Sequence, residues 1–118
     1  MTRTEVSRDF RVSEALLSSY EGAGLIPCRR GSDGEPVYRE QEVQLVSLIR
    51  SLLDTGMKQE ALRKYLSLRA EAKDTRPEQI RILRKHRARL LDELHGCQSA
   101  LEHVDYIIYE TEKGRKHT

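Results

Sequence analysis

Residues 77–113 constrain the fold most, because they carry a regular apolar repeat. Between Ile80 and Ile108 the apolar positions alternate at spacings of three and four residues, and only Arg87 interrupts them. A mean spacing of 3.5 residues is the period of a left-handed coiled-coil seam. The seam positions that can be buried are Ile80, Leu83, Leu90, Leu94, Cys97, Leu101, Val104 and Ile108. The repeat therefore predicts one long helix with an apolar stripe.

The length of this helix indicates that it has a partner. Pro77 suits a first helical turn, Thr75 is a candidate cap and Gly114 marks the end. A helix of about 35 residues spans roughly 50 Å and cannot bury its stripe against itself. In a chain of 118 residues, a second copy is the simplest partner, so we predict a homodimer through this seam. The alternative is a monomeric bundle that contains one long helix.

Composition favours a protein that gains burial by association. The chain is 37% hydrophobic and 34% charged, a balance that is typical of a helix-rich protein with a small core. No apolar run approaches the ~20 residues of a membrane span, and no apolar segment follows the N-terminus, so we expect a cytoplasmic protein without membrane contact. Residues 1–68 hold ten Lys/Arg and ten Asp/Glu, and residues 69–118 hold eleven and nine. Nucleic-acid binding must therefore depend on individually placed side chains.

The N-terminal residues predict a helix-turn-helix. Residues 4–10 and 14–21 each suit a short helix, and Ser13 is a good N-cap for the second one, with the acidic Glu14 in its first turn. In a helix-turn-helix the second helix enters the major groove of DNA. Length alone makes this signal weak, because any small helical domain contains such pairs.

A small two-stranded wing is expected next. Asp33-Gly34 is a strong tight-turn dipeptide, and it is flanked by Leu25-Ile26 and Val37-Tyr38. Proline has no backbone N–H to donate, so Pro36 limits the pairing of its strand and indicates an edge strand. Apolar spacing then predicts helices at 40–54 and 58–68.

The predicted fold class is mainly α, a winged helix-turn-helix domain followed by a long dimerising coiled-coil helix. The predicted domains are a DNA-binding domain at 1–68, a linker at 69–76, the coiled-coil helix at 77–113 and a tail at 114–118.

This order of elements resembles the MerR family of bacterial transcription regulators. The resemblance rests on Val12-Ser13, Leu17, Tyr20-Glu21, Gly24 to Pro27, Tyr38, Val43, Leu45, Ile49 to Leu52, Gly56 and Leu62. It covers about residues 4–68 by motif and the remainder by architecture, and the ending at 105–110 looks like short members without a separate effector domain.

The resemblance implies a homodimer that is held by an antiparallel coiled coil. Each protomer of the family places its second helix in a major groove and its wing on the flanking backbone. The implied partners are a second copy of the chain and double-stranded DNA with an inverted-repeat promoter site, and RNA polymerase is a further candidate partner.

Departures from the family pattern weaken the implied DNA contacts. Ser18 and Ser19 stand where the family has Arg-Tyr, Glu35-Pro36 replaces a Tyr-Arg pair in the wing, and Leu53 replaces a basic residue. Fewer phosphate contacts mean weaker and less salt-sensitive binding. The candidate DNA-binding residues that remain are Ser13, Ser18, Ser19, Tyr20, Arg29, Arg30, Tyr38, Arg39 and Arg50.

Several of these candidates have a plain structural alternative. Ser13 is first a helix cap, Tyr20 can close the small core, Tyr38 can pack on the third helix, and Arg50 can pair with an acidic neighbour. On the scale of the whole chain, the alternative to DNA binding is a protein-interaction module that has shed its DNA contacts and pairs with another regulator or with polymerase.

The sequence contains no convincing catalytic set. None of the four histidines is four residues from another, and the two cysteines, Cys28 and Cys97, have no metal-ligand spacing. Metal-sensing relatives place a cysteine at the start of the long helix, where this chain has Thr75-Arg76-Pro77. We therefore expect neither an enzyme nor a metal sensor, and no cofactor.

Overall fold

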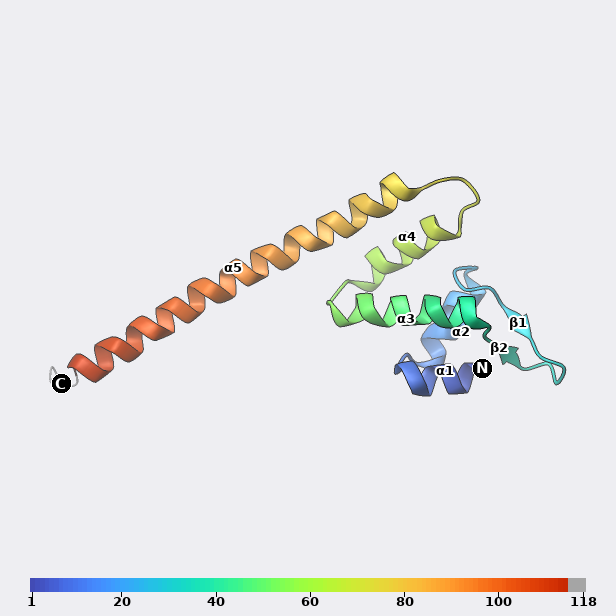
Figure 1. Cartoon of the computed structure of the whole chain (residues 1–118), viewed down its shortest axis with the longest axis horizontal. Helices are drawn as coiled ribbons and strands as arrows, with labels where there is room; N and C mark the ends of the chain where they lie inside the picture. Colours follow the sequence, from blue (N-terminus) through green and yellow to red (C-terminus); the bar gives the residue numbers. More distant parts are fainter. Residues whose placement is uncertain (115–118) are drawn as a thin grey trace. The chain divides into compact units, whose positions relative to one another are not determined.

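The computed structural model of the chain describes residues 1–114 and is mainly helical. The elements in order are α1 (Arg3–Phe10), α2 (Glu14–Gly22), β1 (Arg29–Arg30), β2 (Pro36–Val37), α3 (Glu40–Asp54), α4 (Gln59–Ala70) and α5 (Arg76–Gly114) (Figure 1). The chain divides into two compact units, residues 1–82 and the part from residue 83 onward. The predicted fold class is confirmed, and the predicted tail lies outside the described residues from residue 115 on.

Two capped helices open the first unit. The Thr2 hydroxyl accepts a hydrogen bond from the Glu5 amide at 3.1 Å, and the Glu5 carboxylate accepts one from the Thr2 amide at 2.8 Å. This reciprocal pair satisfies two backbone donors at the start of α1. The Ser13 hydroxyl accepts from the Leu16 amide at 3.1 Å, which confirms the predicted cap of α2.

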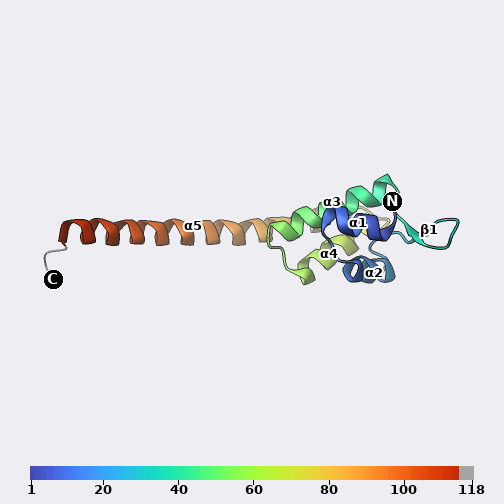
Figure 2. The ribbon, with the colours of Figure 1, turned by 90° about the horizontal axis from the view of Figure 1, so that it is seen from below.

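The core of the first unit lies between α1, α2, α3 and α4. Its fully buried apolar side chains include Val6, Leu17, Ile26, Val46, Ile49 and Leu62. Tyr20 on α2 is also fully buried, and its hydroxyl donates to the Gln59 side-chain oxygen at 3.1 Å. This bond fixes the start of α4 against α2, and the two helices lie side by side in Figure 2. The position of α2 is therefore set by the core.

The wing is present, but its first strand differs from the expected one. β1 and β2 pair antiparallel, with Arg29 opposite Val37, around a turn in which the Gly34 amide donates to the Gly31 carbonyl at 3.0 Å. Gly34 has a φ of 83°, which suits glycine. The expectation that Leu25-Ile26 forms a strand is wrong, because both of their amides bond back to the Tyr20 carbonyl and close the end of α2.

α5 is one continuous helix of 39 residues, and none of them is buried. The Thr75 hydroxyl does not cap α5, because within the described residues it bonds to no backbone amide of the helix. It donates to the Leu68 carbonyl at 2.6 Å and accepts from the side-chain amide of Gln79 at 3.0 Å. The Asp74 carboxylate instead accepts from the Arg76 amide at 3.0 Å. Within residues 1–114, no helix is long and apolar enough to cross a membrane.

Candidate nucleic-acid interface

The solvent-exposed face of α2 is small and polar. Ala15, Ser18, Ser19 and Gly22 are all exposed, and they lie on one face because they are separated by about one helical turn or are adjacent. Short side chains of this kind allow a helix to approach base edges closely, and serine hydroxyls can bond bases or phosphates. α2 itself contains no Lys or Arg.

A positive charge reaches this face from another helix. The Arg63 Nη1 atom on α4 lies 3.3 Å from the Ser19 hydroxyl. The Arg63 Cζ atom also lies 5.5 Å from the centre of the Tyr20 ring. Burial raises the pKa of Tyr20, and the Arg63 charge partly offsets that rise. Local sequence patterns do not indicate this contact, because the two residues are 44 positions apart in the chain.

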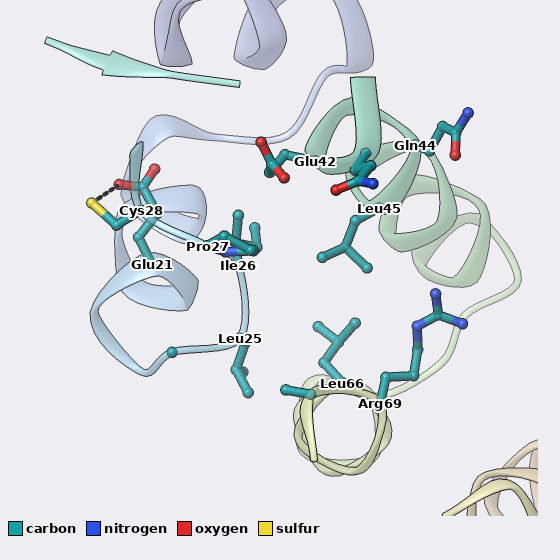
Figure 3. A pocket seen from close by; sticks show the side chains of 13 residues that line it. Glu21, Leu25, Ile26, Pro27, Cys28, Glu42, Gln44, Leu45, Leu66 and Arg69 are labelled. Carbon is teal, nitrogen blue, oxygen red and sulfur yellow. Dashed lines mark hydrogen bonds between the residues drawn. The ribbon is translucent and has the colours of Figure 1, made fainter. Parts of the chain in front are cut away.

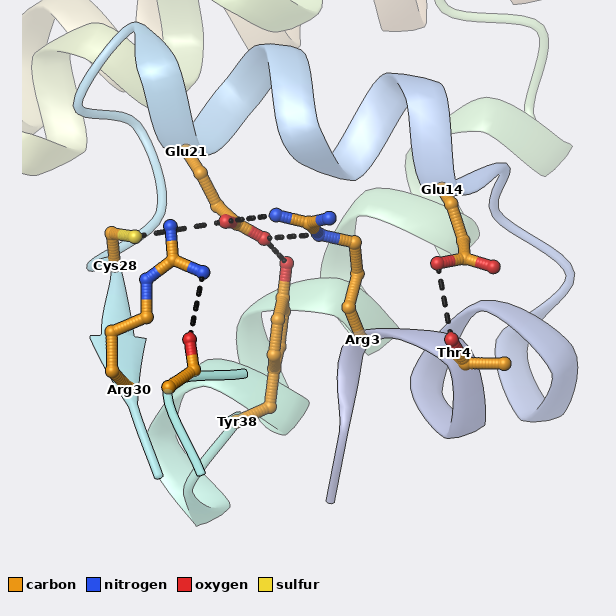
Figure 4. Close-up of polar contacts among 8 residues, drawn as sticks. Arg3, Thr4, Glu14, Glu21, Cys28, Arg30 and Tyr38 are labelled. Atoms are coloured by element: carbon orange, nitrogen blue, oxygen red, sulfur yellow. Dashed lines mark hydrogen bonds and ion pairs between the residues drawn. The ribbon is translucent and has the colours of Figure 1, made fainter. Parts of the chain in front are cut away.

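A buried carboxylate joins α1, α2 and the end of the wing (Figure 4). Glu21 accepts two hydrogen bonds from the Arg3 guanidinium, at 2.9 and 3.0 Å, and a third from the Tyr38 hydroxyl. The Cys28 thiol lies 3.7 Å from the same carboxylate. The bonds from Arg3 lower the pKa of Glu21, with a smaller effect in the same direction from Tyr38. The pKa of Tyr38 is raised by burial and by its bond to Glu21.

A second buried carboxylate organises the base of the wing. The Glu42 side chain is only 2% exposed, and it accepts from the Arg29 Nε atom at 3.0 Å and from the Arg39 backbone amide at 3.0 Å. Arg29 is therefore neutralised on one side by an ion pair. Arg30 is exposed and donates to the Gly34 carbonyl at 3.3 Å, and the Arg39 side chain is also exposed.

Arg50 supports the turn between α1 and α2. Arg11 ends α1 in the left-handed conformation, with a φ of 55°, and Arg50 donates to its carbonyl at 2.7 Å. The same guanidinium pairs with Asp54 at 2.8 Å, one turn along α3. The expected pairing of Arg50 with Glu42 or with a residue on another helix is not found: Glu42 pairs with Arg29, and Arg50 pairs with Asp54 on its own helix.

The predicted DNA-binding residues fall into three groups. Ser18, Ser19, Arg30 and Arg39 are exposed, and Ser13, Arg29 and Arg50 each have a structural partner. Tyr20 and Tyr38 are buried in the core, with exposures of 0% and 3%. Burial of both side chains argues against their assignment to DNA: Tyr20 closes the core as its alternative stated, whereas the Tyr38 hydroxyl bonds to Glu21 on α2. Glu21, Glu42 and Arg63 were not predicted as site residues, because each acts through a partner that is distant in the sequence.

An open groove of about 830 Å³ lies between the loop after α2, the first half of α3 and the second half of α4 (Figure 3). Its apolar side chains include Leu25, Ile26, Leu45 and Leu66. Its two carboxylates, Glu21 and Glu42, are already bonded to Arg3 and Arg29. Across residues 1–114, no group of three or more His, Cys, Asp or Glu side chains is placed to hold a metal ion.

The seam of α5 presents its apolar side chains to solvent in a single chain. Leu101 is 62% exposed, and Ile80, Leu94, Val104 and Ile108 are each about half exposed. Cys97 is exposed as a free thiol, and Leu83 and Leu90 are half-buried. Within the described part of a single chain, the apolar stripe of α5 therefore remains partly exposed to solvent.

Comparison with known proteins identifies the family. The profile of the MerR HTH family regulatory protein matches residues 1–68, more than half of the chain. The chain belongs to the MerR family. It is also 31% identical over 93 residues to the HTH-type transcriptional regulator AdhR of Bacillus subtilis (strain 168), a match that covers 78% of this chain and 66% of AdhR. The family is one of transcriptional regulators, and the sequence-based assignment to it is confirmed.

Solved MerR structures have the same fold. A crystal structure assigned to this family from Listeria monocytogenes is 27% identical, with a TM-score of 0.76 over 97% of this chain and 86% of that one. HiNmlR, a MerR family regulator lacking the sensor domain and bound to promoter DNA, is 19% identical, with a TM-score of 0.72 over 97% of this chain and 91% of its own. A MerR family regulator from Bacillus thuringiensis is 18% identical, with a TM-score of 0.68 over 93% of this chain and 97% of that one. At 19% and 18% identity, the last two structures show only that this chain shares their fold.

The cap of α2 gives a first test of the MerR helix-turn-helix. Replacing Ser13 by alanine removes the acceptor for the Leu16 amide and is expected to lower the free energy of unfolding by about 1 kcal/mol. Ser18→Ala on the exposed face of the same helix is the matched control and is expected to change it by less than ~0.5 kcal/mol. Denaturant unfolding measures both. Equal losses in the two variants would contradict the capping role.

Proposed function

We propose that the chain is a homodimeric, sequence-specific DNA-binding regulator of transcription that acts in the cytoplasm on an inverted-repeat promoter site. The observation that carries the proposal is the exposed polar face of α2, which the core holds rigidly beside a wing with exposed cationic side chains. In this proposal α2 enters the major groove, and Ser18 and Ser19 meet base edges or phosphates. Arg30 and Arg39, which are exposed, contact the flanking backbone.

The dimer is needed because one head has too few contacts for a specific site. Residues 1–68 have no net charge, so bulk attraction to DNA is weak. Two heads held at a fixed spacing bind the same duplex cooperatively and read two half-sites about one helical turn apart. The exposed seam of α5 supports this arrangement, since pairing two such stripes removes them from water. RNA polymerase is the further partner that a promoter-bound regulator of this family would meet.

DNase footprinting on the region upstream of the protein's own gene tests the proposal. We expect a saturable footprint at micromolar dimer or below, with two protected half-sites related by a twofold axis. Its affinity is expected to fall as salt rises, with a modest slope because few phosphates are contacted. Absence of any saturable, salt-sensitive protection at micromolar dimer would refute DNA-binding regulation.

The second candidate is a protein-interaction module on the same scaffold. It is favoured by the engagement of Arg29 with Glu42 and of Arg50 with Asp54, which leaves fewer cations for phosphates than the family pattern contains. In this function the same surface binds another regulator or polymerase. A dimer that binds purified RNA polymerase but leaves no footprint on DNA would select this candidate.

A further inference from the structure

Arg63 is held beside the exposed face of α2 from two sides. Its Nη1 atom lies 3.3 Å from the Ser19 hydroxyl, and its guanidinium stacks 5.5 Å from the centre of the Tyr20 ring. Tyr20 is fully buried in the core, and its hydroxyl bonds to Gln59 on α4. The guanidinium therefore lies beside Ser19 in the free chain.

The charge of Arg63 is not neutralised by the residues that the structure describes. Ion pairs within residues 1–114 engage other arginines, among them Arg3, Arg29 and Arg50, whereas the contacts of Arg63 are a neutral hydroxyl and an aromatic ring. A guanidinium has five N–H donors, of which the Ser19 contact uses one. Stacking occupies its face and leaves its edge open, and the side chain is partly exposed. Charge and donors thus remain for an external anion.

We propose that Arg63 contacts a DNA phosphate and supplies from α4 the positive charge that Ser18 and Ser19 do not supply on α2. This inference rests on the proposed function. A phosphate bonded to the Ser19 hydroxyl lies within reach of Arg63, because the two side chains are already in contact. A stacked, planar guanidinium loses little conformational freedom when it binds, and its bonds to phosphate are charge-assisted.

Arg63→Ala tests the assignment through salt dependence. Equilibrium binding is measured over a salt series on a duplex from upstream of the protein's own gene and on a scrambled duplex of equal length. We expect binding at low salt to weaken roughly tenfold and the slope of log K against log salt to fall by ~0.9 for each chain. Both duplexes should be affected alike, because a phosphate contact carries no sequence information.

Arg69→Ala is the matched control. Arg69 is also on α4 and stacks 5.9 Å from the Tyr65 ring, but it lines the groove of Figure 3. Its loss is expected to leave the salt slope unchanged. Arg63→Lys should retain the slope and Arg63→Gln should lose it as alanine does, which keeps the test valid if the alanine variant unfolds. Thermal melting reports the folding of each variant.

The outcomes separate this inference from the function on which it rests. If the wild-type dimer binds with a salt slope that Arg63→Ala and Arg63→Gln leave intact, the assignment of Arg63 is wrong while DNA binding stands. Equal losses of slope in Arg63→Ala and Arg69→Ala would also overturn it, since bulk charge would then account for the effect. If the wild type binds neither duplex, the proposed function and the role of Arg63 fail together.

Discussion

Replacing Leu94 by aspartate is expected to convert the proposed dimer into monomers. Leu94 lies in the middle of the α5 seam and is 52% exposed in the single chain, so pairing would bury it. An aspartate there would place an unpaired charge in a desolvated seam, at a cost of about 3 kcal/mol for each chain. Two such sites would raise the dimer dissociation constant by about four orders of magnitude.

Ser99→Asp is the matched control for this change. Ser99 lies on the face of α5 opposite the seam, by the 100° rotation per residue of an α-helix, and it is exposed. It therefore receives the same charge without entering the interface. Sedimentation velocity should give a monomer for Leu94→Asp and a dimer for Ser99→Asp, and footprinting should fail only for the first. A stable dimer of Leu94→Asp would show that the seam is assigned to the wrong residues.

Local rules predicted most of the helices. The bounds of α3 agree with the expected 40–54, because its apolar period, the acidic residues of its first turn and the glycine after its end all indicate the same segment. Gly56 has a φ of 80°, as the stop after such a helix requires. The long helix α5 followed from one repeat, since a period of 3.5 residues sustained from Ile80 to Ile108 matches a helix and does not match the two-residue period of a strand.

Contacts between distant residues were not predictable in the same way. Leu25-Ile26 was a local error: its composition suits a strand, but the glycine cap at Gly24, with a φ of 75°, turns both amides back to the Tyr20 carbonyl. Tyr20 and Tyr38 have the amphipathic character of surface contacts, and only the folded chain supplies Gln59 and Glu21 as their hydrogen-bond partners. A single sequence records residue types and local spacing, so it indicated a helix-turn-helix but not which of its polar side chains remain exposed.

Replacing Glu21 by alanine is expected to cause the largest loss of stability in the first unit, about 3 kcal/mol. Glu21 is 8% exposed, and its removal strands the Arg3 guanidinium and the Tyr38 hydroxyl without their shared acceptor. The matched control is Glu14→Ala on the same helix. Its carboxylate is exposed and accepts from the Thr4 hydroxyl at 3.1 Å, so its loss should cost less than ~0.5 kcal/mol (Figure 4). Denaturant unfolding at neutral pH compares the two, and similar midpoints would contradict the structural role of Glu21.

The same carboxylate makes the stability of the helix-turn-helix depend on pH. The Arg3 bonds lower the pKa of Glu21 below its ordinary value of 4.5, so the folded state binds this proton less readily than the unfolded state. The stabilisation is therefore complete above about pH 4.5 and is lost as pH falls through the lowered pKa of the folded state. Glu21→Gln cannot ionise, so its free energy of unfolding should lie well below that of the wild type at pH 7 and approach it as the solution is acidified. A difference between the two proteins that stays constant from pH 7 into this acid range would mean that the charge of Glu21, as distinct from its shape, contributes nothing to the fold.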